Sequence, residues 1–126
     1  MELINSHREL KVYQMAFKNA MDIYHLTKSF PKEETYSLTS QIRRSSRSVN
    51  SNIAEAFRRR QYPKSFLSKL SESEAEAGET QNWLDFSLAC EYLSVENHRL
   101  LDTEYDKIIG MLVIMQRFPE KWTIKT

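Results

Sequence analysis

The sequence is poor in the residues that break helices. Its 126 residues include two glycines and three prolines, so few tight turns are available and a small number of long helices is favoured. Gly78 and Gly110 stand far apart, which excludes a glycine-rich phosphate-binding loop. The single cysteine, Cys90, excludes an intramolecular disulfide and is typical of a reducing compartment.

Long hydrophobic runs and excess charge are also scarce. The longest apolar run, residues 108–115, is too short to cross a bilayer, and the first ten residues contain no apolar segment typical of a signal peptide. A net charge of +1 provides no global attraction for nucleic acid or membranes, so any such contact needs a local patch. We therefore expect a cytoplasmic protein without a membrane partner, folded as a single domain over residues 1–126.

Apolar residues recur at helical spacing in four segments with start or stop signals at their ends. Ser6 and Glu9 have the spacing of a capping box, and prolines follow or begin the later segments. Short connections make consecutive helices antiparallel, so the sequence predicts an all-α, up-down-up-down antiparallel four-helix bundle. The expected helices are residues 7–29, 35–60, 63–92 and 95–118. A loose tail is expected at 120–126, and Trp122 could pin it to the bundle.

The spacing also predicts which face of each helix turns inward. For the first helix the predicted stripe is Leu10, Tyr13, Phe17, Ala20 and Tyr24. The second helix has a stripe whose middle is small and polar, which would let a neighbouring helix come close. Its members are Leu38, Ile42, Val49, Ile53 and Phe57, with Ser45, Ser46 and Ala56 in the gaps. The fourth helix is expected to bury Leu101, Tyr105, Ile108, Leu112 and Met115.

Two apolar features exceed what one bundle core needs. Residues 108–115 are apolar around the whole helix, and Trp83, Phe86 and Cys90 lie on a different side of their helix from its core leucines. One interpretation is packing at the end of the bundle beneath the tail; the favoured one is contact between subunits. We therefore predict a homo-oligomer with these residues near the subunit contacts: Trp83, Phe86, Met111 and Ile114.

Charge is segregated between the second and third helices. Residues 36–64 carry a net charge of +6, and residues 65–91 carry −5. One interpretation is ion pairing between helices or subunits, in which case the protein is an interaction scaffold that binds no nucleic acid. The other is that part of the arginine surface binds RNA or DNA phosphates. The candidate residues are Arg43, Arg44, Arg47, Arg58, Arg59, Arg60 and Lys64, of which 58–60 are expected to be the most exposed.

No set of residues has the pattern of an enzyme or a metal site. Glu72, Glu76 and Glu79 share a helix face, but no histidine follows them at the spacing that di-metal bundles use. Cys90 has no histidine or basic neighbour in sequence, so we expect an inert packing residue. We therefore expect a non-catalytic protein with no cofactor and no metal.

Several motifs together resemble a known family. They are FPKEETYSL, LTSQIRR and NIAEA within residues 30–60, EAGETQNWL within 64–84, and EYLS at 91–94. They resemble the proteins encoded within bacterial 23S ribosomal RNA intervening sequences. This resemblance implies a four-helix bundle that assembles as a homopentamer, and it extends to the pentameric accessory proteins of diversity-generating retroelements, which work with a reverse transcriptase and nucleic acid. Ala56 departs from the family pattern, which has glycine after NIAE.

Overall fold

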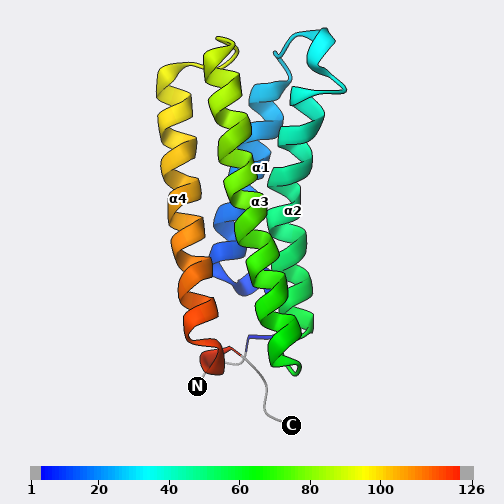
Figure 1. Cartoon of the computed structure of the whole chain (residues 1–126), viewed down its shortest axis with the longest axis vertical. Helices are drawn as coiled ribbons and strands as arrows, with labels where there is room; N and C mark the ends of the chain where they lie inside the picture. The colour runs from blue at the N-terminus through cyan, green and yellow to red at the C-terminus, as the bar shows by residue number, and fades with distance from the viewer. Residues whose placement is uncertain (1–3, 123–126) are drawn as a thin grey trace.

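The computed structural model describes residues 4–122, and over this range it contains four α-helices and no strand. They are α1 (Lys11–Thr27), α2 (Leu38–Arg58), α3 (Pro63–Ala89) and α4 (Val95–Arg117). The helices run alternately up and down, consecutive helices are neighbours, and α4 also contacts α1 (Figure 1). This arrangement confirms the predicted antiparallel bundle. None of the described helices combines the length and hydropathy that crossing a bilayer requires.

Two helices begin later than predicted, and the first three end two or three residues early. The capping box is present, because Ser6 Oγ accepts from the Arg8 amide at 3.2 Å and Glu9 accepts from the Ser6 amide at 3.0 Å. It caps only a 3₁₀ turn, His7–Glu9, and the extended backbone of Leu10 (ψ 128°) makes α1 begin at Lys11. Residues 35–37 form a turn after a second 3₁₀ segment, Lys32–Glu34, so α2 begins later than predicted.

The inward face of α1 was predicted wrongly. Leu10 is buried, but Phe17 is 53% exposed. The helix has two apolar stripes, and the one that turns inward contains polar residues that bond within the helix. The Asn19 amide donates to the Met15 carbonyl at 2.8 Å, and the Thr27 hydroxyl donates to the Tyr24 carbonyl at 3.1 Å. The buried residues of α1 are Val12, Ala16, Asn19, Ile23 and Thr27.

The predicted stripes of α2 and α4 are confirmed in full, and the close neighbour of α2 is α3. Small residues line the contact between these two helices. Ser45 Oγ and Thr80 Oγ1 lie 2.8 Å apart, and the Ser73 hydroxyl donates to the Val49 carbonyl at 2.8 Å. Ala77, between Ser73 and Thr80 on α3, is completely buried. Buried hydroxyls are thus paired where the two backbones approach.

The end of the chain is tied to the bundle up to Trp122. A 3₁₀ turn, Pro119–Lys121, follows α4, and Trp122 packs against the core as the sequence indicated. The rest of the predicted tail, residues 123–126, lies outside the described residues.

Candidate functional site

A shallow hollow of about 500 Å³ lies along the first half of α2 and the turn before it. It brings together three of the predicted arginines with five hydroxyl side chains and one tyrosine. The arginines and serines share this surface because they recur three or four residues apart on one helix face. The lining residues are Thr35, Tyr36, Thr39, Ser40, Arg43, Arg44, Arg47, Ser48 and Ser51. We call this surface the arginine hollow.

Helix α1 orients two of these arginines. Arg43 donates from Nε to Thr27 Oγ1 at 2.8 Å, and its guanidinium lies 5.0 Å from the centre of the Tyr24 ring. The Arg47 guanidinium lies 5.9 Å from the same ring, and the residue is exposed. Among the ion pairs within residues 4–122, none joins Arg43 or Arg47 to a carboxylate. Arg43 is therefore held in place by α1, Arg47 contacts only the Tyr24 ring, and no described carboxylate neutralises either charge.

Arg44 differs from Arg43 and Arg47 because it pairs with carboxylates of α3. Its two terminal nitrogens lie 3.0 Å from Glu79 and 3.4 Å from Glu76. Burial raises the pKa of the Glu76 carboxyl, and the positive charge of Arg44 opposes that shift. The ion-pair interpretation of the segregated charge thus holds for Arg44.

The second arginine cluster, residues 58–60, lies at the opposite end of α2 and is partly engaged by the protein. Arg59 approaches Glu55 at 3.7 Å and donates to Ser65 at 3.1 Å. Arg60 donates to the Phe57 carbonyl at 2.9 Å and lies 3.6 Å from the centre of that ring. Burial lowers the pKa of Arg60. Arg58 and Lys64 are exposed. The cluster therefore mixes exposed cations with cations that the protein engages, whereas the sequence predicted that residues 58–60 are the most exposed.

The sequence did not point to the other residues of the arginine hollow. Tyr36 is 95% exposed, and it was missed because residues 35–37 were assigned to a helix rather than to a turn. The Thr39 hydroxyl is buried and has no hydrogen-bond partner within residues 4–122. The density of Ser and Thr around the arginines was the available signal, since hydroxyls often accompany arginine at phosphate sites.

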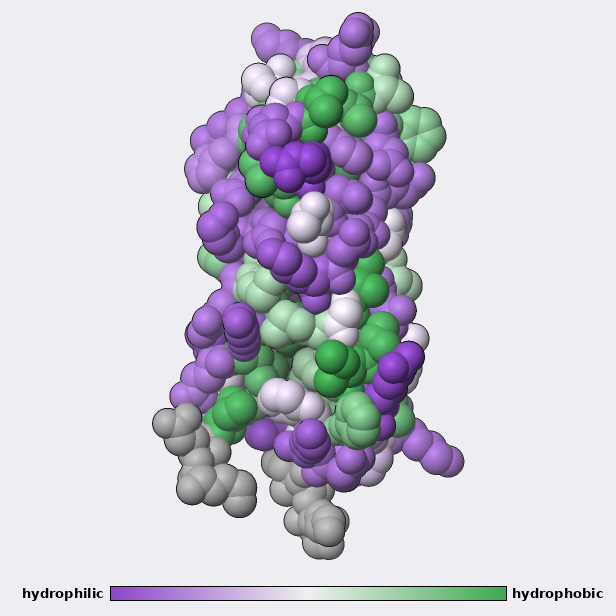
Figure 2. All heavy atoms as spheres, turned by 90° about the vertical axis from the view of Figure 1, so that its left-hand side faces the viewer, coloured by the Kyte–Doolittle hydropathy of each residue, from purple (hydrophilic) through white to green (hydrophobic). Residues whose placement is uncertain are grey.

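The predicted subunit-contact residues divide into two pairs. Phe86 and Ile114 are 53% and 57% exposed, whereas Trp83 and Met111 are half-buried against the core. Figure 2 views the side of the bundle that α4 occupies; apolar side chains gather on its lower half, whereas its upper half is mainly hydrophilic with a few apolar side chains near the top. Further exposed apolar residues that the prediction missed are Phe17, Met21, Val95, Leu100 and Phe118.

Cys90 does not occupy the environment that the sequence indicated. It was expected to be a packing residue, but it is exposed at the end of α3. The helix ends at Ala89, and the chain turns through Glu91, which has a positive φ of 63°. The Cys90 amide still donates to the Phe86 carbonyl at 2.9 Å, so Cys90 lies on the same side of the helix as Phe86, and that side is exposed.

The acidic residues considered for metal binding serve as ion-pair partners. Glu76 and Glu79 bind Arg44, and Glu72 pairs with Lys69 at 3.0 Å. A different group, Asp85, His98 and Asp102, has ligand atoms within 4.8 Å of one another. The 2.8 Å contact of His98 Nε2 with Asp85 accounts for this proximity without an ion. Burial and the nearby Asp106 charge raise the pKa of Asp102.

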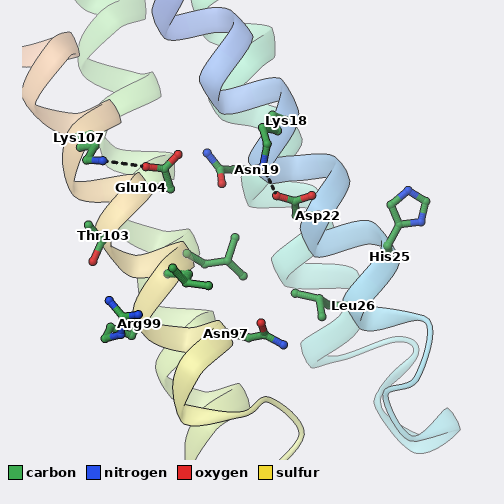
Figure 3. A pocket seen from close by; sticks show the side chains of 12 residues that line it. Lys18, Asn19, Asp22, His25, Leu26, Asn97, Arg99, Thr103, Glu104 and Lys107 are labelled. Carbon is green, nitrogen blue, oxygen red and sulfur yellow. Dashed lines mark hydrogen bonds and ion pairs between the residues drawn. The ribbon is translucent and has the colours of Figure 1, made fainter.

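A second hollow, of about 560 Å³, lies between α1 and α4 (Figure 3). The side chains of Asn19 and Leu26 reach into it from α1. Its charges are largely matched, since Lys18 pairs with Asp22 at 3.0 Å and Lys107 with Glu104 at 3.2 Å. It contains none of the predicted site residues and lacks the excess of positive charge that distinguishes the arginine hollow.

These features define an all-α four-helix-bundle protein with a basic hollow on one helix and exposed apolar residues on others. Residues 8–113 match the family model described as 23S rRNA-intervening sequence protein. The chain belongs to this family, as the sequence motifs indicated.

A solved structure supports the same conclusion. The chain resembles a protein of unknown function from the S23 ribosomal protein family of Bacteroides thetaiotaomicron, with 28% identity and a TM-score of 0.76. The similarity covers 84% of this chain and 95% of the other. No curated protein matches the chain by sequence.

Proposed function

We propose that this protein is a non-catalytic, homo-oligomeric nucleic-acid-binding protein that holds phosphates in the arginine hollow. The observation that carries the proposal is the placement of Arg43 and Arg47. Both are positioned against Tyr24, and neither has a carboxylate partner within the described residues. Arginine in a fixed orientation suits the planar, charged oxygens of a phosphate.

The rest of the arginine hollow has matching chemistry. Serine and threonine hydroxyls line it, no carboxylate is among its lining residues, and the amino-terminal end of α2 with its positive dipole lies beside it. Hydroxyls and arginines contact the nucleic-acid backbone without reading base sequence. We therefore expect binding that depends on charge and depends little on base order. Arg58, Arg59 and Lys64 would extend the contact to the far end of α2 and the start of α3.

Binding to RNA and DNA should weaken steeply with salt, because each neutralised phosphate releases a counterion. We expect the affinity for short oligonucleotides to fall at least about tenfold between roughly 50 and 200 mM salt. Fluorescence anisotropy across a salt series measures this. Absence of binding even at about 50 mM salt would overturn the proposal and favour the scaffold alternative, in which the arginines serve only ion pairs such as Arg44 with Glu79.

Assembly as a homopentamer is part of the proposal. It rests on the exposed apolar residues Phe86 and Ile114 and on the pentamer that the sequence resemblance implies. A ring would repeat the arginine hollow, and linked weak sites gain affinity through effective concentration. Light scattering at micromolar concentration should give the mass of five 14.9-kDa chains. A mass of 14.9 kDa would contradict the assembly.

A further inference from the structure

Tyr36 stands at one end of the arginine hollow with nearly its whole side chain in solvent. It lines the hollow together with Arg43 and Arg47, and it is 95% exposed. A single exposed aromatic ring is common on protein surfaces and by itself indicates no binding site. Here the ring lines the same hollow as these two arginines and a buried Thr39 hydroxyl. Within residues 4–122 neither arginine has a carboxylate partner, although Arg43 bonds to α1, and the Thr39 hydroxyl has no hydrogen-bond partner. The combination places an aromatic surface in the same hollow that we propose holds phosphates.

The turn that carries Tyr36 is tied to the bundle. The Ser37 hydroxyl donates to Glu34 at 2.6 Å, and the Tyr92 hydroxyl, beyond the end of α3, donates to the same carboxylate at 3.0 Å. These bonds lower the pKa of Glu34 and raise the pKa of Tyr92 to about 12. Tyr92 in turn packs against Phe30, with ring centres 5.5 Å apart. The turn that carries Tyr36 is therefore anchored, so less backbone entropy is lost when a ligand stacks on the ring.

The geometry points to single-stranded nucleic acid as the ligand, with an unpaired base stacked on Tyr36 and a neighbouring phosphate held by Arg43 and Arg47. This inference rests on the proposed function and narrows its substrate class. Sites for single strands combine a basic groove with aromatic rings, because an unpaired base has a free face to stack. Within a duplex the base faces are stacked on one another, so Tyr36 would contribute nothing there.

The test compares Tyr36→Ala and Tyr36→Phe with Tyr62→Ala, a control at the other end of α2 where a second exposed tyrosine lies (58% exposed). Each protein is titrated with fluorescent oligouridine and with an RNA duplex at fixed low salt. We expect the unaltered protein to prefer the single strand. Tyr36→Ala should weaken oligouridine binding about tenfold and leave duplex binding unchanged. Tyr36→Phe keeps the ring, so it should bind as the unaltered protein does.

The outcomes separate this inference from the proposed function. If Tyr36→Ala binds oligouridine like Tyr62→Ala while affinity still falls with salt, the stacking inference is overturned and the phosphate-binding proposal stands. If the unaltered protein prefers the duplex, the inference is overturned in the same way. If it binds neither RNA at low salt, or if polyglutamate competes as well as oligouridine, both are overturned and an acidic protein partner is favoured. Because Tyr36 is almost fully exposed, its substitution should leave the fold unchanged.

Discussion

Replacing Ala77 with leucine is expected to lower the free energy of unfolding by roughly 1–3 kcal/mol. Ala77 is completely buried, between the two α3 residues whose hydroxyls bond to α2, Ser73 and Thr80. Three added carbon atoms have no space there without separating the helices or forcing strained rotamers. Separation would also break the buried hydroxyl bonds, which leaves polar groups unpaired.

Ala75 offers a matched control on the same helix. It is exposed, so Ala75→Leu makes the same chemical change with similar helix propensity, and we expect a change within about 0.5 kcal/mol. Urea unfolding at one fixed protein concentration compares the two variants, since assembly makes apparent stability depend on concentration. Equal effects at Ala77 and Ala75 would mean that α2 and α3 do not approach as closely as described.

Replacing the three arginines of the hollow with glutamine is expected to cost roughly 100-fold in affinity for single-stranded RNA at about 50 mM salt. Removing Arg43, Arg44 and Arg47 should also flatten the slope of log affinity against log salt by about 2 per bound subunit. Glutamine keeps the helix propensity while removing the charge. Anisotropy titrations over a salt series measure both quantities.

The same change at residues 58–60 is the control, because it also removes three positive charges, here from the last residue of α2 and the turn after it. Arg59 and Arg60 are engaged with Glu55, Ser65 and Phe57, so we expect a smaller loss of affinity. If the two triple variants lose affinity equally, binding depends on general positive charge and the arginine hollow is not a distinct site. Arg44→Gln alone is a further control for folding, since it leaves Glu76 and Glu79 without their partner.

The sequence predicted the bundle well where one apolar stripe runs along the whole helix. On α2 and α4 every predicted inward residue is buried, and the second apolar face of α4 is concentrated in residues 108–115, so it did not displace the main stripe. On α1 two stripes compete, and the prediction favoured the aromatic one with Phe17. Asn19 lies in the buried stripe because its amide bonds within its own helix, and apolar periodicity carries no information about such a bond.

The sequence identified the arginines that make up the candidate site, but it did not predict how their side chains are arranged and paired. The segregated charge identified all the arginines, yet it did not distinguish Arg44, which pairs with α3, from Arg47, which pairs with no described carboxylate. That difference depends on which helix lies opposite each side chain. The sequence did not identify Tyr36 as a site residue, because Tyr36 lies in the turn before α2 and therefore outside the helical pattern.

The most direct test of the central claim is to map which arginines a bound oligonucleotide protects. Phenylglyoxal modifies accessible arginines, and mass spectrometry reports the rate at each position with and without oligouridine. We expect Arg43 and Arg47 to be protected, whereas Arg99, an exposed arginine of α4, should be modified at an unchanged rate. Equal rates at Arg43 and Arg47 with and without bound RNA, or protection confined to residues 58–60, would contradict the central claim.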